Sequence, residues 1–223
     1  EVIWSLLGPE QKFANSTPIL ASKKEVHVAT NDIIGGVGYD GSGRVGSDSV
    51  FVCIGEKSVS LVEPETGKIL KNFNLPGEMY VNGSLKPVIY DSLLIFGTAN
   101  EGVVALDMSK NFAQAWNFKT NPSRIYTVPY SKDFQQTVTG SCLIIGGICY
   151  FGANDGYLYA VEAKTGIFVN RLNLGVPILA GPVSAYPAQT TSPTPASSDG
   201  EVIYINDFAG RLIKLKLSFK SSL

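Results

Sequence analysis

The chain has 223 residues, of which 44% are hydrophobic and 17% are charged, and its net charge at pH 7 is −1. This length and apolar content allow one β-domain of ordinary size with a continuous core. So small a net charge gives no electrostatic footprint for nucleic acid or an acidic membrane surface. No run of apolar residues approaches the roughly 18 that a helix needs to cross a bilayer.

A segment that recurs four times along the chain predicts the fold. Each copy contains an apolar strand, a short turn, and a second apolar strand that ends near an acid. The copies are Ser49–Phe73, Ser92–Phe118, Gly146–Leu174 and Gly200–Leu223. The second strands end in register at Glu63, Asp107 and Glu162, and in the divergent fourth copy Lys216 takes the place of the acid. Their spacing fits the blades of a β-propeller, which have roughly 40–50 residues each, with insertions in the longer copies.

Two further strands complete each repeat. The first lies upstream and opens with a proline or a small polar residue, at Ser16–Leu20, Leu85–Ile89, Thr139–Leu143 and Gly181–Ser184. The fourth is more polar, at Ile69–Asn74, Phe112–Phe118 and Ile167–Leu174, and it follows a Gly-bearing turn in the first and third copies. Four antiparallel strands make one blade. We therefore predict an all-β protein, a β-propeller with about four visible blades, as a single domain over residues 1–223.

The two ends of the chain predict how the ring closes. Glu1–Gly8 has the pattern of a fourth strand, and Gly181–Phe219 has the pattern of three strands without a fourth. We expect Val2–Leu7 to pair beside Arg211–Leu217, because closure removes exposed sheet edges. The alternative is a piece of a larger propeller. Since the chain begins at Glu1, we expect a processed form or an excised piece.

Segments between the repeats are predicted to be surface loops. Residues 31–48 are rich in glycine, and residues 187–199 are rich in proline, serine and threonine. The only short helical candidate is Phe112–Trp116.

The three cysteines, Cys53, Cys142 and Cys149, form no C-x-x-C pair, which excludes zinc-ribbon and thioredoxin-like motifs. We interpret them as buried small apolar residues. One disulfide between Cys142 and Cys149 on neighbouring strands is an alternative.

Few residues offer catalytic chemistry, and we predict no catalytic residue. His27 is the single histidine and lies in an alternating strand, where an outward or hydrogen-bonded side chain is the common case. No G-x-S-x-G motif is present. The repeat acids Glu63, Asp107 and Glu162 are expected to fix the turns that follow them by accepting backbone N–H bonds.

The candidate metal ligands are Asp40, Ser42 and Asp48, in a loop that faintly resembles a calcium loop. Arg44 stands where a third acid would be expected, so we favour a glycine-rich hairpin and predict no metal site.

Surface features are compatible with an exported protein. The sequons at Asn15 and Asn82 permit N-glycosylation. Aromatic side chains that lie near loops are candidate binding residues, and they are Tyr80, Tyr90, Tyr126, Tyr130 and Tyr186. The low content of charged residues also suits an extracytoplasmic protein, periplasmic, surface-bound or secreted.

The third repeat resembles that of the pyrroloquinoline-quinone-type β-propellers, which reads roughly A-x-D-x-x-T-G-x-x-x-W. Ala160, Glu162, Thr165 and Gly166 match this pattern. Glu63, Thr66 and Gly67 match in the first copy, and Ala105 and Asp107 match in the second, with Trp116 one residue late. The resemblance implies a propeller of quinoprotein type over most of the chain.

What the resemblance implies for function divides into two classes. Quinoprotein dehydrogenases of this kind hold pyrroloquinoline quinone under a disulfide between adjacent cysteines, with a calcium ion, and this chain has no adjacent cysteines. Non-enzymatic relatives are assembly or interaction scaffolds. We therefore predict a non-catalytic scaffold, without cofactor, that binds a partner protein or assembles with itself. The alternatives are a quinoprotein-like oxidoreductase fragment and a carbohydrate- or surface-binding module.

Overall fold

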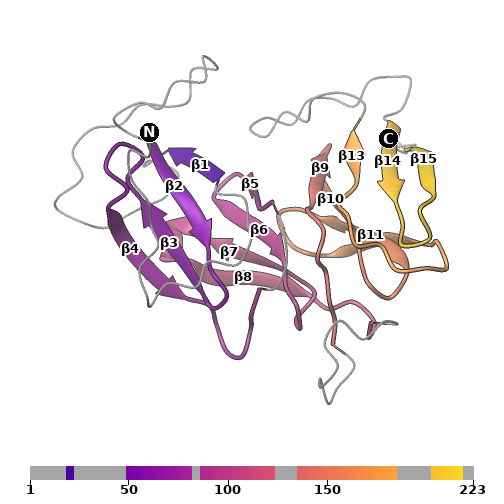
Figure 1. The fold of residues 1–223 in the computed structure, drawn as a ribbon, viewed down its shortest axis with the longest axis horizontal. Coiled ribbons are helices and arrows are strands. Elements are labelled where there is room, and N and C mark those ends of the chain that lie inside the picture. The colour runs from indigo at the N-terminus through magenta and orange to yellow at the C-terminus, as the bar shows by residue number, and fades with distance from the viewer. Residues whose placement is uncertain (1–18, 23–48, 82–85, 124–134, 185–201, 218–223) are drawn as a thin grey trace.

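The structure is a computed structural model that describes residues 19–22, 49–81, 86–123, 135–184 and 202–217. Within these ranges the chain forms 15 β-strands and a single 3₁₀ turn, η1 (Met108–Lys110). The strands form four antiparallel sheets, each built from consecutive segments of the chain (Figure 1). No helix in the described part of the chain has the length and apolar character needed to cross a membrane.

Each sheet is one predicted repeat, and we refer to the sheets as blades one to four. Blade one contains β1 (Ile19–Ser22), β2 (Ser49–Ile54), β3 (Ser58–Val62) and β4 (Ile69–Asn74). Blade two contains β5 (Val88–Tyr90), β6 (Leu93–Gly97), β7 (Val103–Asp107) and β8 (Ala113–Phe118). Blade three contains β9 (Leu143–Ile145), β10 (Ile148–Gly152), β11 (Tyr157–Glu162) and β12 (Phe168–Asn173). Blade four contains β13 (Val183–Ser184), β14 (Val202–Asn206) and β15 (Leu212–Lys216).

The blades pack face to face because their inner strands are apolar on both faces. Strand β6 is buried at every position, with Leu94 and Phe96 in the core shared with blade one. Its alternate residues Leu93 and Ile95 lie in the core shared with blade three. A third core joins blades three and four and includes Ile203 of β14. Successive residues of a strand point to opposite faces, so a continuous apolar run suits a strand between two neighbouring sheets.

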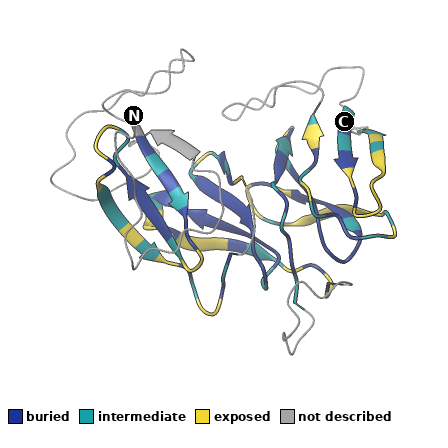
Figure 2. Cartoon of the chain, in the orientation of Figure 1, coloured by how far each residue is buried: buried dark blue, intermediate teal, exposed yellow. Residues whose placement is uncertain are grey.

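The outer strands are more exposed than the inner ones, as Figure 2 shows by their yellow and teal segments. Every residue of β12 is exposed, and β15 alternates between exposed and half-buried positions. A β-bulge interrupts the pairing of the outer strand at equivalent places in three blades, at Leu61/Val62, Ala105/Leu106 and Ala160/Val161. These regularities confirm the prediction of a β-propeller with about four blades.

The structure corrects the short helical candidate at Phe112–Trp116. Strand β8 occupies that segment from Ala113 onward, and the only helical turn among the described residues is η1, which ends at Lys110. Asn111 and Phe112 have φ of 53° and 57°, a left-handed backbone that ends the turn and directs the chain into β8.

The predicted ring closure and the two predicted loops lie outside the described residues. Among the described strands, blade four has the order β13-β14-β15, with β15 at the outer edge. The pairing of Val2–Leu7 with this edge therefore stays a prediction, as do the loops at residues 31–48 and 187–199.

Candidate functional site

The candidate metal ligands Asp40, Ser42 and Asp48 lie outside the described residues, together with His27 and the sequon residues Asn15 and Asn82. The described ranges contain no group of three or more His, Cys, Asp or Glu side chains that could hold a metal ion. The functional site that the described residues support is therefore built from other side chains.

Two of the five candidate binding tyrosines are described, and both take part in packing. The hydroxyl of Tyr80 donates to Oε1 of Gln135 over 2.7 Å, and its backbone N–H donates to Oδ1 of Asn100. Tyr90 packs against the core between blades two and three. Tyr126, Tyr130 and Tyr186 lie outside the described residues.

The repeat acids fix their turns in two different ways. Oδ1 of Asp107 accepts the backbone N–H of Ser109, as predicted. Glu162 instead accepts the hydroxyl of Thr165 over 2.8 Å, and Glu63 accepts the hydroxyl of Thr66 in the same way. At these two turns the prediction was wrong. The N–H of the turn glycine donates to the backbone carbonyl of the glutamate, and the glutamate carboxylate accepts the threonine hydroxyl instead of a backbone N–H.

The turn of blade three is held against blade two by a tryptophan. Nε1 of Trp116, on β8, donates to the carbonyl of Ala163 over 3.1 Å. The indole lies directly on Gly166, where a Cβ atom would come within 2.7 Å of its ring. Gly166 also has φ of +70°, which glycine adopts without steric cost. Trp116 is therefore buried between two blades, although it belongs to an outer strand.

Strand β12 begins directly after this turn and presents an apolar surface. Ile167 is 59% exposed, Phe168 is 50% exposed and Val169 is 47% exposed. Leu172, further along the strand, is 43% exposed but lies on the opposite face, because it pairs with Leu158 whereas Phe168 pairs with Val161. We call Ile167, Phe168, Val169 and the adjoining Phe118 the apolar rim. Three consecutive exposed apolar side chains at the start of an edge strand exceed the scattered single residues that are normal at a protein surface.

The rim is joined to the core by stacked aromatic rings. Phe168 stacks on Phe118 with 6.2 Å between centroids and 11° between ring planes. Phe118 in turn meets Tyr159 and Phe151 edge-on, at 5.4 and 5.8 Å. Since Tyr159 and Phe151 are buried, this chain of rings holds an exposed side chain in a defined position.

A polar network anchors the inner end of these rings. The hydroxyl of Tyr159 donates to Oδ2 of Asp155 over 2.5 Å, and the same carboxylate accepts the N–H groups of Asn121 and Tyr157. Burial, together with the Asp155 carboxylate, raises the pKa of Tyr159 to about 12. The phenol therefore remains protonated at neutral pH and keeps its hydrogen bond to Asp155.

One backbone donor of β12 is already bonded to a side chain of the same strand. Neighbouring residues of a strand direct their backbone N–H groups to opposite sides. Oδ1 of Asn170 accepts the N–H of Arg171 over 2.8 Å. The guanidinium of Arg171 lies over the ring of Tyr157, 4.8 Å from its centroid. Pairing of another strand with β12 would therefore have to displace Asn170 from the N–H of Arg171.

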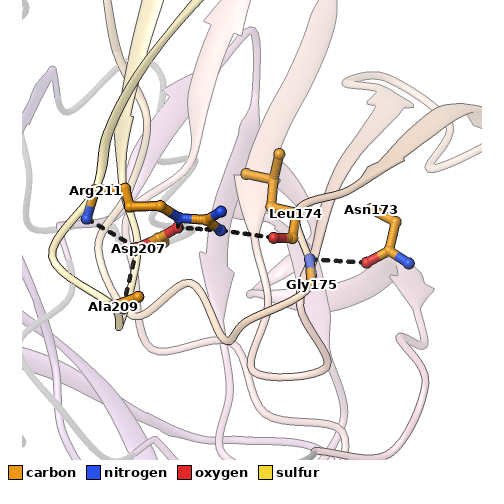
Figure 3. Close-up of polar contacts among 6 residues, drawn as sticks. All are labelled: Asn173, Leu174, Gly175, Asp207, Ala209 and Arg211. Carbon is orange, nitrogen blue, oxygen red and sulfur yellow. Dashed lines mark hydrogen bonds and ion pairs between the residues drawn. The ribbon is translucent and has the colours of Figure 1, made fainter.

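Arg211 of blade four reaches the end of blade three and is held in place by the buried carboxylate of Asp207, as Figure 3 shows. Asp207 accepts the N–H groups of Ala209 and Arg211, and the guanidinium of Arg211 also donates to the carbonyl of Leu174. Burial alone would raise the pKa of Asp207, but the backbone N–H and guanidinium of Arg211 hold it below its usual value. This contact fixes the β14–β15 turn, from which Phe208 projects with 62% exposure.

The apolar rim was missed from the sequence, although a signal was present. The three residues Ile167, Phe168 and Val169 are consecutive and apolar, at the start of a strand predicted to be polar. Consecutive residues of a strand point to opposite faces, so such a run on an outer strand exposes at least one of them.

Comparisons with known proteins support the fold. No family model matches the sequence, and no curated protein matches it. The solved structure of Sqt1 from Saccharomyces cerevisiae aligns with a TM-score of 0.60 at 11% identity, over 91% of this chain and 45% of Sqt1. The computationally designed Ika4 protein gives a TM-score of 0.48 at 10% identity, over 78% of this chain and 88% of Ika4. BamB from Moraxella catarrhalis gives 0.45 at 14% identity, over 78% of this chain and 62% of BamB.

The chain thus spans less than half the length of Sqt1, and identity this low bears on the fold alone. Four consecutive antiparallel sheets, packed face to face and similar to a solved propeller, make this chain a β-propeller.

Proposed function

We propose that this chain is a non-catalytic β-propeller scaffold that binds a partner protein through the apolar rim. The observation that carries the proposal is the exposure of the consecutive apolar residues Ile167, Phe168 and Val169 at the start of the edge strand β12. Aromatic residues fixed in position are frequent centres of binding energy at protein interfaces, because little side-chain entropy is lost when they are covered.

Side-chain docking is the binding mode that the contacts favour. The N–H of Arg171 is already bonded to Asn170, so an added strand would first have to break that bond. The partner surface is expected to be apolar and to place a cavity or flat patch over Phe168. A second copy of this chain is included, since self-assembly would use the same surface.

The quinoprotein-type repeat is part of the proposal as a structural class only. Its support is the position of Trp116 against the Thr-Gly turn of the next blade. The arrangement implied for a quinone does not fit the described residues, because Cys142 and Cys149 lie apart in the sequence and are buried between blades. We propose that the protein works without a quinone and outside the cytosol. An absorbance spectrum after addition of pyrroloquinoline quinone and calcium tests the first point, and a bound chromophore would refute it.

The experiment for the rim compares two aspartate substitutions of exposed phenylalanines. Phe168→Asp places a charge in the rim, and Phe208→Asp places one at a similarly exposed site on blade four. Proteins that cross-link to the wild type are identified by quantitative mass spectrometry, and one is then purified for titration. Sedimentation velocity of the chain alone measures self-association in parallel.

We expect Phe168→Asp to weaken binding or self-association at least about tenfold, the size of effect seen for interface hot spots. Phe208→Asp should change it less than about twofold. Equal affinity of both variants and the wild type for every partner, with no self-association, would refute the proposal.

A further inference from the structure

We propose that Cys142 and Cys149 are a redox pair that forms a disulfide within blade three when the protein meets an oxidising thiol–disulfide environment. The inference is independent of the proposed binding function. It assigns a modification site to two side chains that the apolar rim does not use.

The strand register brings the two cysteines together. Cys149 pairs with Ile144 in the β9–β10 ladder, so Cys142, two residues before Ile144, lies diagonal to it on the same face of the sheet. Both side chains belong to the core between blades two and three, with Cys149 fully buried and Cys142 9% exposed. The neighbouring thiol of Cys142 and burial raise the pKa of Cys149 well above its usual value.

The Cα atoms of a diagonal pair lie slightly farther apart than those of a disulfide, so a small backbone shift is required. Diagonal residues in a regular ladder have Cα atoms about 7–8 Å apart, whereas disulfides span about 4.4–6.8 Å. Cys142 lies before the first residue of β9 and belongs to none of the three pairs of the β9–β10 ladder, so we expect it to be able to move about 1 Å toward Cys149 without breaking them. Cys53 lies on β2 in blade one and is a free cysteine, so it serves as an internal control for the two cysteines of blade three.

The reaction balances with oxidised glutathione as the electron acceptor. The Sγ atoms of Cys142 and Cys149 form one S–S bond, and the disulfide bond of oxidised glutathione breaks. The two electrons lost by the protein reduce glutathione to two thiols, which take up the two protons. Since a thiol with a raised pKa is poorly ionised, exchange in the folded protein is expected to be slow. The equilibrium must therefore be approached by refolding as well as from the native state.

The test is a glutathione redox titration of the full chain, with alkylation and peptide mass spectrometry. Trypsin releases Cys142 and Cys149 together on Asp133–Lys164, and Cys53 on Val45–Lys57. The same titration is made after refolding in each buffer and again in denaturant. We expect Asp133–Lys164 to change from two labels to none and to become about 2 Da lighter, while Cys53 keeps its label.

The folded chain should favour the disulfide at least about tenfold over the denatured chain, because folding fixes the two thiols as neighbours. Cys53→Ser should leave this titration unchanged, and Cys142→Ser should leave Cys149 with one label. Two labels on Asp133–Lys164 in the most oxidising buffer after refolding would overturn the proposal. So would a disulfide that includes Cys53, or an equilibrium constant for disulfide formation that is the same in denaturant as in the folded chain.

Discussion

At the level of single residues, Gly166 is a position where the fold leaves no room for a side chain. It combines a positive φ of +70° with an indole ring directly above it. Gly175 provides a matched comparison, because its φ is +85° and no atom lies within 4 Å of the place where a Cβ would stand. The two glycines therefore separate backbone strain from steric overlap.

We expect Gly175→Ala to lower the free energy of unfolding by about 1 kcal/mol, the cost of a left-handed backbone for alanine. Gly166→Ala should lower it by about 2–4 kcal/mol, because displacement of Trp116 adds an overpacking cost. Urea unfolding measures both, from midpoints at equal slope. Equal losses for the two variants would show that Trp116 moves away without cost.

Asp207 gives a prediction about pH. Its pKa is held below the ordinary value in the folded protein by Arg211, although burial acts in the opposite direction. A carboxyl with a lowered folded pKa contributes stability above its unfolded pKa of about 3.9, and loses it as the pH falls through the folded value.

The wild type should therefore be more stable than Asp207→Asn near pH 6. The difference in stability between the two proteins should become smaller as the pH falls to about 3 and below. Thermal unfolding followed by circular dichroism at a series of pH values measures this difference. A difference in stability that stays constant as the pH falls from 6 through the range in which carboxyl groups take up protons would mean that the Asp207–Arg211 pair adds no ionic stabilisation.

At the level of strands and turns, Trp116 couples two blades, and a conservative change tests this. Trp116→Phe keeps an aromatic ring but removes the 3.1 Å hydrogen bond to the carbonyl of Ala163. We expect a loss of about 1–2 kcal/mol in unfolding free energy from the lost bond and the space left by the smaller ring.

Hydrogen exchange should locate this effect. Amides of the turn from Ala163 to Ile167 should exchange faster in Trp116→Phe, because local opening follows from the weaker contact. The equivalent turn from Glu63 to Lys68 in blade one is an internal control and should not change. Faster exchange in both turns would indicate a global loss of stability instead.

The strands were predictable from the sequence, and the surface of β12 was not. Alternating or continuous apolar runs bounded by glycine turns identify strands such as β6 and β11, since these signals are local. The burial of Trp116 and the exposure of Phe168 depend on how blade two meets blade three, and no local pattern contains that information. The same holds for η1, where Asp107 caps a 3₁₀ turn that the apolar pattern does not predict.

At the level of the whole molecule, blade four has an open edge among the described strands. In blades one to three, a fourth strand pairs with the third strand and forms the outer edge. In blade four, β15 is the third strand, and no described strand pairs with its outer edge. A free edge of this kind is an aggregation hazard, which is the physical reason to expect that Val2–Leu7 covers it. The backbone alternation places the N–H groups of Lys214 and Lys216 at this edge, since Ile213 and Leu215 face β14.

Hydrogen exchange of the full chain and of a variant lacking residues 1–8 tests most directly whether the blades form a closed ring. We expect the amides of Lys214 and Lys216 to be protected in the full chain and to exchange at least about tenfold faster in the shortened chain. Protection in β6 and β7, which lie in blade two, should fall much less. Equal and rapid exchange of Lys214 and Lys216 in both chains would contradict closure by the N-terminal strand and leave four blades in an open series.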